Sequence, residues 1–123
     1  MHDIGLLKIG RHFRMGACKV VCARNESECG ALRSRAADGD GLFEAADCMG
    51  PVVLLRGPAD EAAQRLAAGV AAAYSDGDAA EVTVNAQMVG ADAREWRVTR
   101  PSRETLNPYR IEPKRQPQAD PRP

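Results

Sequence analysis

The alanine-rich segment 59–74 places the strongest constraint on how this chain can fold. Its larger apolar side chains recur at four-residue steps: Leu66, Val70 and Tyr74. This period puts them on one face of a helix, with small alanines beside them that permit close packing. Asp60 and Glu61 suit the positive end of such a helix, and Pro58 suits its first turn. We therefore predict a helix over residues 59–74 that packs closely through one apolar stripe.

Shorter segments carry the patterns of strands, either alternating or continuously apolar. The run 52–55 (Val-Val-Leu-Leu) is the most apolar in the chain and is predicted to be a central strand. Further strands are predicted at residues 11–15, 19–23, 42–45, 81–84 and 94–99. In the first of these we expect Phe13 and Met15 to face the core and Arg11 to face outward. With only 4% aromatic residues, the core must rest on aliphatic side chains.

A second helix is predicted over about residues 25–35. Asn25 is a suitable N-cap, and Glu28 stands three residues later, where a capping-box partner would be. Leu32 is the main apolar anchor of this helix, so it needs the sheet for stability.

The sequence therefore predicts an α+β fold with a single small domain at residues 1–111. We expect a mixed or antiparallel sheet of about five or six strands with two packed helices, at about 25–35 and 59–74. The Pro-rich segment 112–123 is predicted to be a disordered tail.

The net charge of zero hides a segregated distribution along the chain. Residues 1–35 carry seven Lys and Arg against three acids, residues 36–93 carry two against ten, and residues 94–123 carry eight against four. The ends are thus basic and the middle is acidic. Such segregation can build the positive face that a phosphate backbone needs. The acidic middle equally allows a protein-interaction or docking domain that meets a basic partner.

The motifs of common enzyme classes are absent. The sequence has no phosphate-binding loop, no dinucleotide-binding glycine motif and no nucleophile elbow, and its only histidines are His2 and His12. We expect a domain that is not catalytic by itself and uses no cofactor. No apolar run approaches the ~20 residues of a membrane span, and the first residues do not form a secretory signal. We therefore expect a cytoplasmic protein with no membrane partner.

The four cysteines are Cys18, Cys22, Cys29 and Cys48. Only the first two resemble the close pair of a zinc motif, and no second pair follows. In a strand, positions 18 and 22 share a face, so they are the candidate metal ligands. Reduced, buried thiols that act as small hydrophobic residues are the favoured interpretation. A cysteine-based metal or sulfur-carrier site remains an alternative.

Three stretches together resemble the NFACT RNA-binding domain family. They are Leu6-Leu7-Lys8-Ile9-Gly10-Arg11-His12-Phe13-Arg14 with Val20-Val21-Cys22-Ala23-Arg24-Asn25, the stretch from Asp40 to Gly57, and Ala71-Ala72-Ala73-Tyr74-Ser75 with Glu81-Val82-Thr83-Val84. The best match is to the bacterial branch found at the C-terminus of PP-loop tRNA 2-thiouridylate methyltransferase-like, or tRNA thiolation, proteins.

The resemblance implies an accessory domain that binds RNA, in particular tRNA, within a larger tRNA-modification protein. Its partners would be tRNA and the N-terminal domain of that protein. A basic strand surface would form the RNA-binding site: Lys8, Arg11, His12, Arg14, Lys19, Arg24 and Asn25. The family's Trp and His positions are here Leu42, Glu44 and Val52, so the resemblance implies weakly specific binding that is dominated by the RNA backbone.

Overall fold

The computed structural model describes residues 10–57, 60–77, 79–90 and 93–111. The strands are β1 (Arg11–Met15), β2 (Cys18–Cys22), β3 (Gly41–Ala45), β4 (Val53–Arg56), β5 (Glu81–Met88), β6 (Ala93–Thr99) and β7 (Arg110–Ile111). The helices are α2 (Glu26–Arg35), α3 (Glu61–Ala73), the short α4 (Arg103–Leu106) and the 3-10 helix η1 (Asn107–Tyr109). The two long helices lie where the sequence predicts them.

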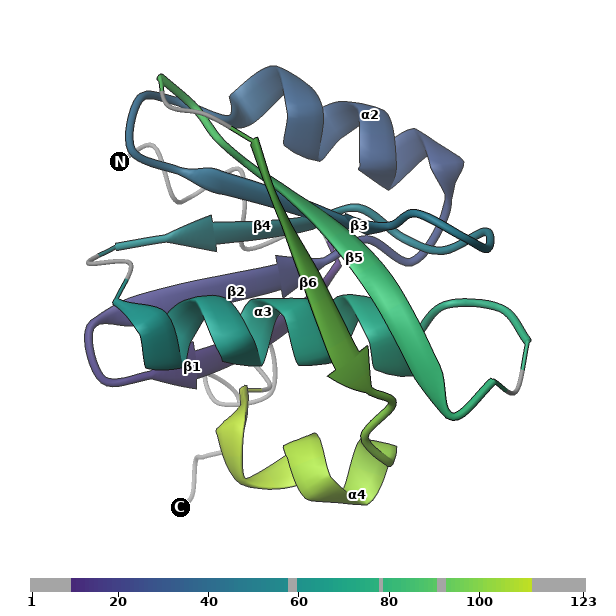
Figure 1. Ribbon diagram of the computed structural model, residues 1–123. Helices are drawn as coiled ribbons and strands as arrows, with labels where there is room; N and C mark the ends of the chain where they lie inside the picture. Colours follow the sequence, from purple (N-terminus) through teal and green to yellow (C-terminus); the bar gives the residue numbers. More distant parts are fainter. Residues whose placement is uncertain (1–9, 58–59, 78, 91–92, 112–123) are drawn as a thin grey trace, which may run out of the picture.

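All described strands belong to one antiparallel sheet, in the order β6-β5-β3-β4-β2-β1-β7. The strand β4 occupies the middle of this order, as predicted from its apolar run. The helix α3 covers one face of the sheet and α2 covers the other (Figure 1). The predicted α+β fold is therefore confirmed, and its sheet is antiparallel rather than mixed.

The burial of β4 on both faces explains its continuous apolar sequence. Val53 and Leu55 join the larger core beneath α3, while Leu54 joins a smaller core beneath α2 that also holds Val21 and Leu32. All three β4 side chains have 0% of their surface exposed. A strand buried on both sides needs apolar residues at consecutive positions rather than at alternate ones.

The apolar stripe of α3 lies against the sheet as predicted. Ala67 and Ala71 have no exposed surface, and Val70 is equally buried between them in sequence. Asp60 caps the helix, because its side chain accepts a hydrogen bond of 2.9 Å from the Ala63 N–H. Alanine side chains let the helix approach the strands closely, so a core with few aromatic residues can still be well packed.

The predicted orientation of Arg11 is wrong. Alternate residues of a strand share a face, so Arg11 lies on the α3 side of the sheet together with Phe13 and Met15. The residues that point to the other side are His12 and Arg14. Arg11 stays accessible because it stands at the very start of β1, at the end of the sheet.

The segment after Pro101 folds back onto the sheet. Ser102 caps α4, Leu106 is buried in the larger core, and β7 pairs with β1 through His12↔Ile111 and Phe13↔Arg110. The sequence predicts no element here, because the segment has little apolar content. The predicted tail 112–123 lies outside the described residues.

Arg100 ties the end of β6 to the loop that follows α3. Its guanidinium donates hydrogen bonds to the carbonyl oxygens of Ala72 and Ser75 at 2.9 and 3.0 Å, and to that of Ala79 at 2.9 Å. These carbonyls end or follow α3, where the regular helix supplies no donor, and that of Ala72 also accepts the Ser75 hydroxyl at 2.7 Å. One side chain therefore ties the backbone at Ser75 and at Ala79 to the end of β6.

Replacing Arg100 with Gln should lower the free energy of unfolding by about 2 kcal/mol, because the carbonyl oxygens of Ala72 and Ser75 lose a charged donor in a partly buried position. Urea denaturation measures this change. Arg97→Gln is the matched control, since Arg97 lies three residues earlier, on β6, with 72% of its side chain exposed, and it should cost no more than about 0.5 kcal/mol. Equal effects of the two substitutions would contradict this role of Arg100.

Candidate nucleic-acid interface

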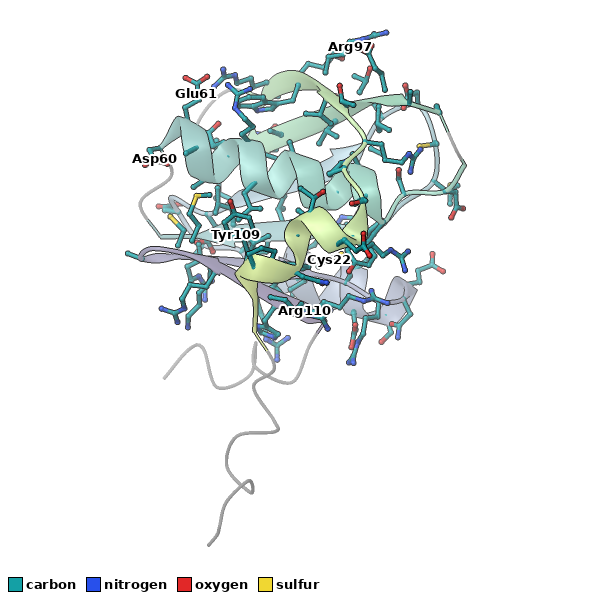
Figure 2. The ribbon with its side chains drawn as sticks, turned by 90° about the horizontal axis from the view of Figure 1, so that it is seen from below. Cys22, Asp60, Glu61, Arg97, Tyr109 and Arg110 are labelled. Atoms are coloured by element: carbon teal, nitrogen blue, oxygen red, sulfur yellow. The ribbon has the colours of Figure 1, made fainter. Side chains whose placement is uncertain are left out.

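A groove of about 460 Å³ opens at the end of the sheet where β2 leads into α2 and where α3 ends. Its cationic side chains come from four separate elements or loops of the chain: Arg11, Arg24, Arg33 and Arg103. Its carboxylates are Glu26, Glu44 and Asp76. Cys22, which lies beside the groove, is toward one end of α3, whereas Asp60 and Glu61 lie at the opposite end (Figure 2).

Two guanidinium groups contact the ring of Tyr74, the residue that follows α3. The Arg11 Cζ atom lies 4.7 Å from the ring centroid and the Arg103 Cζ atom lies 4.4 Å from it. The ring is supported from below by Phe13, edge to face at 6.4 Å between centroids. Cation–π contact positions both guanidinium groups without consuming their hydrogen-bond donors, and Arg11 uses part of its donor set on the Cys22 thiol. Among the described residues, neither arginine has an acidic partner in an ion pair.

Arg24 and Asn25 enter the groove from the junction of β2 and α2. The Asn25 side-chain oxygen accepts the Glu28 N–H at 2.9 Å, which confirms the predicted N-cap. The predicted capping box is wrong in its second half. The Glu28 carboxylate binds the Arg24 backbone N–H at 2.9 Å and the Arg24 guanidinium at 2.6 Å, one residue before the expected donor.

The Arg24–Glu28 ion pair orients the Arg24 side chain and lowers the pKa of the Glu28 carboxyl group. The Arg24 guanidinium, helped by backbone N–H donors, lowers the pKa of Glu28 to about 2 against an opposing effect of burial. Glu28 is 14% exposed and Arg24 is 48% exposed. The carboxylate is therefore the buried support, and the guanidinium keeps an accessible side for a ligand.

The loop 46–52 forms another wall of the groove. The Asp76 N–H donates a 2.7 Å hydrogen bond to the Met49 carbonyl oxygen, which joins this loop to the end of α3. A Cβ atom on Gly50 would lie 2.9 Å from the Ser75 Cβ, so only glycine permits this approach. Met49 is left 76% exposed, and it is the one large hydrophobic side chain so exposed among the described residues.

The structure brings together only part of the predicted site. Arg11, Arg24 and Asn25 line the groove. Arg14 and Lys19 are cross-strand partners near the far end of β1 and β2, on the opposite face of the sheet from Arg11. His12 shares that face and is only 5% exposed, so it is a buried strand residue. Lys8 lies outside the described residues.

The cysteines are mostly core residues. Cys18 and Cys22 face the larger core with 5% and 0% exposure, and burial raises the pKa of both thiols, that of Cys22 to about 12. Such a thiol is protonated at neutral pH and is a poor nucleophile or metal ligand. Among the described residues, no group of three or more His, Cys, Asp or Glu side chains is placed to hold a metal ion.

Sequence reasoning missed Tyr74, Arg103, Arg33 and Met49 as site residues. In the sequence, Tyr74 is the end of the apolar stripe, and Arg103 is one of several basic residues in the C-terminal region. Nothing in the local sequence places either beside Arg11. The pairing of β7 with β1 and the return of α4 bring them together, and both depend on tertiary structure.

A second cluster of arginines and an aromatic ring has a different character. Arg94 and Arg65 lie 4.4 and 5.5 Å from the ring centroid of Trp96. The indole is only 8% exposed, so this ring is covered and belongs to the packing of β6 on α3. The Tyr74 groove is thus the better candidate for a ligand.

A concave surface at the end of an α+β sheet, where arginines and an amide side chain converge, is a kind of surface that nucleic-acid-binding domains use. The family model described as "NFACT protein RNA binding domain" matches residues 10–110. The chain belongs to this family, and an RNA-binding role follows from that membership. The predicted resemblance is confirmed at the level of the family.

Among solved structures, the C-terminal part of the fibronectin/fibrinogen-binding protein from Streptococcus suis has the same fold, with a TM-score of 0.68 at 21% identity. The match covers 84% of the present chain and 49% of the other, so this chain spans about half of that relative's length. A search of curated proteins found no match. No helix in the described part of the chain is long and apolar enough to cross a membrane.

The Glu28 carboxylate gives a pH-dependent contribution to stability. Its folded-state pKa of about 2 lies below its ordinary value of 4.5, so its contribution is fully present above pH 4.5 and is lost as the pH falls toward 2. We expect Glu28→Gln to be less stable than the unaltered chain at neutral pH, with the difference shrinking between these values. Urea denaturation at a series of pH values measures it. A constant difference across this range would contradict the assignment.

Proposed function

We propose that the Tyr74 groove is the RNA-binding site of this domain and that it holds the RNA chiefly through phosphate contacts. The observation that supports this most directly is the convergence of Arg11 and Arg103 on one partly exposed tyrosine ring. Both guanidinium groups keep hydrogen-bond donors available, and arginine matches the geometry of phosphate oxygens. Arg24 and the Asn25 side-chain amide extend the same surface toward α2.

The charge balance of the groove supports moderate affinity. Four arginines face three carboxylates, and two of the arginines already form ion pairs: Arg24 with Glu28 and Arg33 with Glu44, the latter at 3.0 Å. Few phosphate contacts remain to release counterions, so binding energy and salt dependence should both be modest. This agrees with the weakly specific, backbone-dominated binding expected from the sequence.

The natural RNA in this proposal is tRNA. The domain, over residues 1–111, would act as a non-catalytic accessory module of a larger cytoplasmic tRNA-modification protein and would present tRNA to that protein's N-terminal domain. The residues that resemble the tRNA-thiolation branch support this assignment. Competition between a tRNA transcript and an unrelated structured RNA of equal length tests it, and equal competition would contradict a preference for tRNA.

Replacing Arg11 or Arg103 with Gln should weaken RNA binding by about fivefold or more at low salt. Each substitution should also reduce the slope of log affinity against log salt concentration by roughly 0.7 to 0.9, because one phosphate contact is lost. Fluorescence anisotropy with a labelled RNA between about 50 and 300 mM salt measures both quantities.

The matched control is Arg97→Gln, which removes the same charge from an exposed position on β6. Arg97 and Arg110 mark opposite sides of the molecule in Figure 2, and Arg97 is not part of the groove. The control should leave both affinity and salt slope nearly unchanged. Arg11→Lys should keep the slope but lose part of the affinity, because lysine retains the charge without the planar guanidinium. Equal losses for Arg97→Gln and Arg11→Gln would refute the location of the site.

A further inference from the structure

The groove is large enough to hold a chemical group that projects into it. Its volume of about 460 Å³ is within the range of pockets that enclose small ligands. The backbone of a regular RNA duplex is a convex surface with its bases stacked inside, so a duplex can touch the rim without filling this space. A nucleotide that is not base-paired can turn its base into such a concavity.

The walls of the groove differ in a way that suits the two parts of a nucleotide. Arg11 and Arg103 form a cationic wall upon Tyr74, and the loop with Met49 and Pro51 forms a largely apolar wall. The cationic wall can bind a phosphate group through its guanidinium donors. The second offers an exposed thioether, which makes favourable contacts with the edges and faces of aromatic rings.

The exposure of Met49 is the observation that most needs an explanation. It is 76% exposed at the groove, whereas the other described large hydrophobic side chains are at least partly covered. Its loop is held in place by the Asp76 N–H bond to the Met49 carbonyl oxygen and by the close approach of Gly50 to Ser75. The backbone beneath the side chain is therefore fixed before any ligand binds, which reduces the entropic cost of a contact there.

From these observations we propose that the groove is a subsite for one unpaired nucleotide, with its phosphate on Arg11 and Arg103 and its base against Met49. This rests on the proposed RNA-binding function and narrows the ligand to single-stranded or looped RNA. The faces of Tyr74 are contacted by the two guanidinium groups, so the base meets the methionine and the guanidinium planes rather than the phenol ring. Such contacts tolerate different bases because every base has a π-face.

The test compares two RNAs on the full chain, an unstructured RNA of about twelve nucleotides and a duplex of about twelve base pairs. Met49→Ala should weaken binding of the unstructured RNA by about threefold or more and leave duplex binding unchanged. For Met49→Ala, the slope of log affinity against log salt concentration should equal that of the unaltered chain, because no charge is removed. Arg11→Gln, in contrast, should reduce the salt slope on the unstructured RNA.

NMR of the unaltered chain with isotope-labelled methionine methyl groups gives an independent measurement, because it requires no substitution. The Met49 methyl resonance should shift when the unstructured RNA is added, while those of Met15 and Met88, which do not line the groove, should stay in place. Equal effects of Met49→Ala on both RNAs, or an unmoved Met49 resonance at saturation, would overturn the subsite and leave the RNA-binding function standing. Failure of the unaltered chain to bind either RNA would overturn both.

Discussion

The close packing of α3 on the sheet is the contact on which the rest of this structure depends. Its alanine face lets the helix sit near the central strands, so aliphatic residues alone can fill the space between them. The same stripe that builds the core ends at Tyr74, where the helix leaves the sheet. The ring is thus fixed by the core on one side, through Phe13, and supports arginines on the other. The apolar face of α3 therefore builds the core along its length and positions the candidate site at its C-terminal end.

The segregated charge of the sequence acquires a physical meaning from the strand order. The first and last described segments pair as β1 and β7, so arginines that are about ninety positions apart in the chain meet beside the groove. The strands β1, β2 and β7 contain no acidic residue within their described bounds. Most acidic residues of the middle segment are kept elsewhere, and the few that line the groove moderate its charge. A neutral protein can in this way keep a locally cationic surface.

Sequence patterns were sufficient for the elements whose burial is periodic or complete. The stripe of α3, the central β4 and the Asn25 cap each carry a local signature, and the structure has all three. Local sequence patterns do not predict the features that form only through tertiary contacts. The strand β7 needs β1 as a partner, and the Arg24–Glu28 pair replaces the expected capping box because a charged donor is available one residue earlier. For the same reason Tyr74 and Arg103 could not be recognised as neighbours of Arg11.

The predicted site illustrates how residue polarity misleads when it is allowed to override strand alternation, because positions 11, 13 and 15 of one strand share a face. A cationic residue among apolar ones was expected to face away from them, yet Arg11 shares the face of Phe13. It avoids burial because β1 begins there, and a long side chain can bury its stem while its charged end reaches the surface. This position also suits Arg11 for binding a ligand. Its guanidinium emerges from the edge of a packed core, so holding it in place costs little side-chain entropy. Arg14 and Lys19, which satisfy simple alternation, lie on the other face of the sheet and share no groove with it.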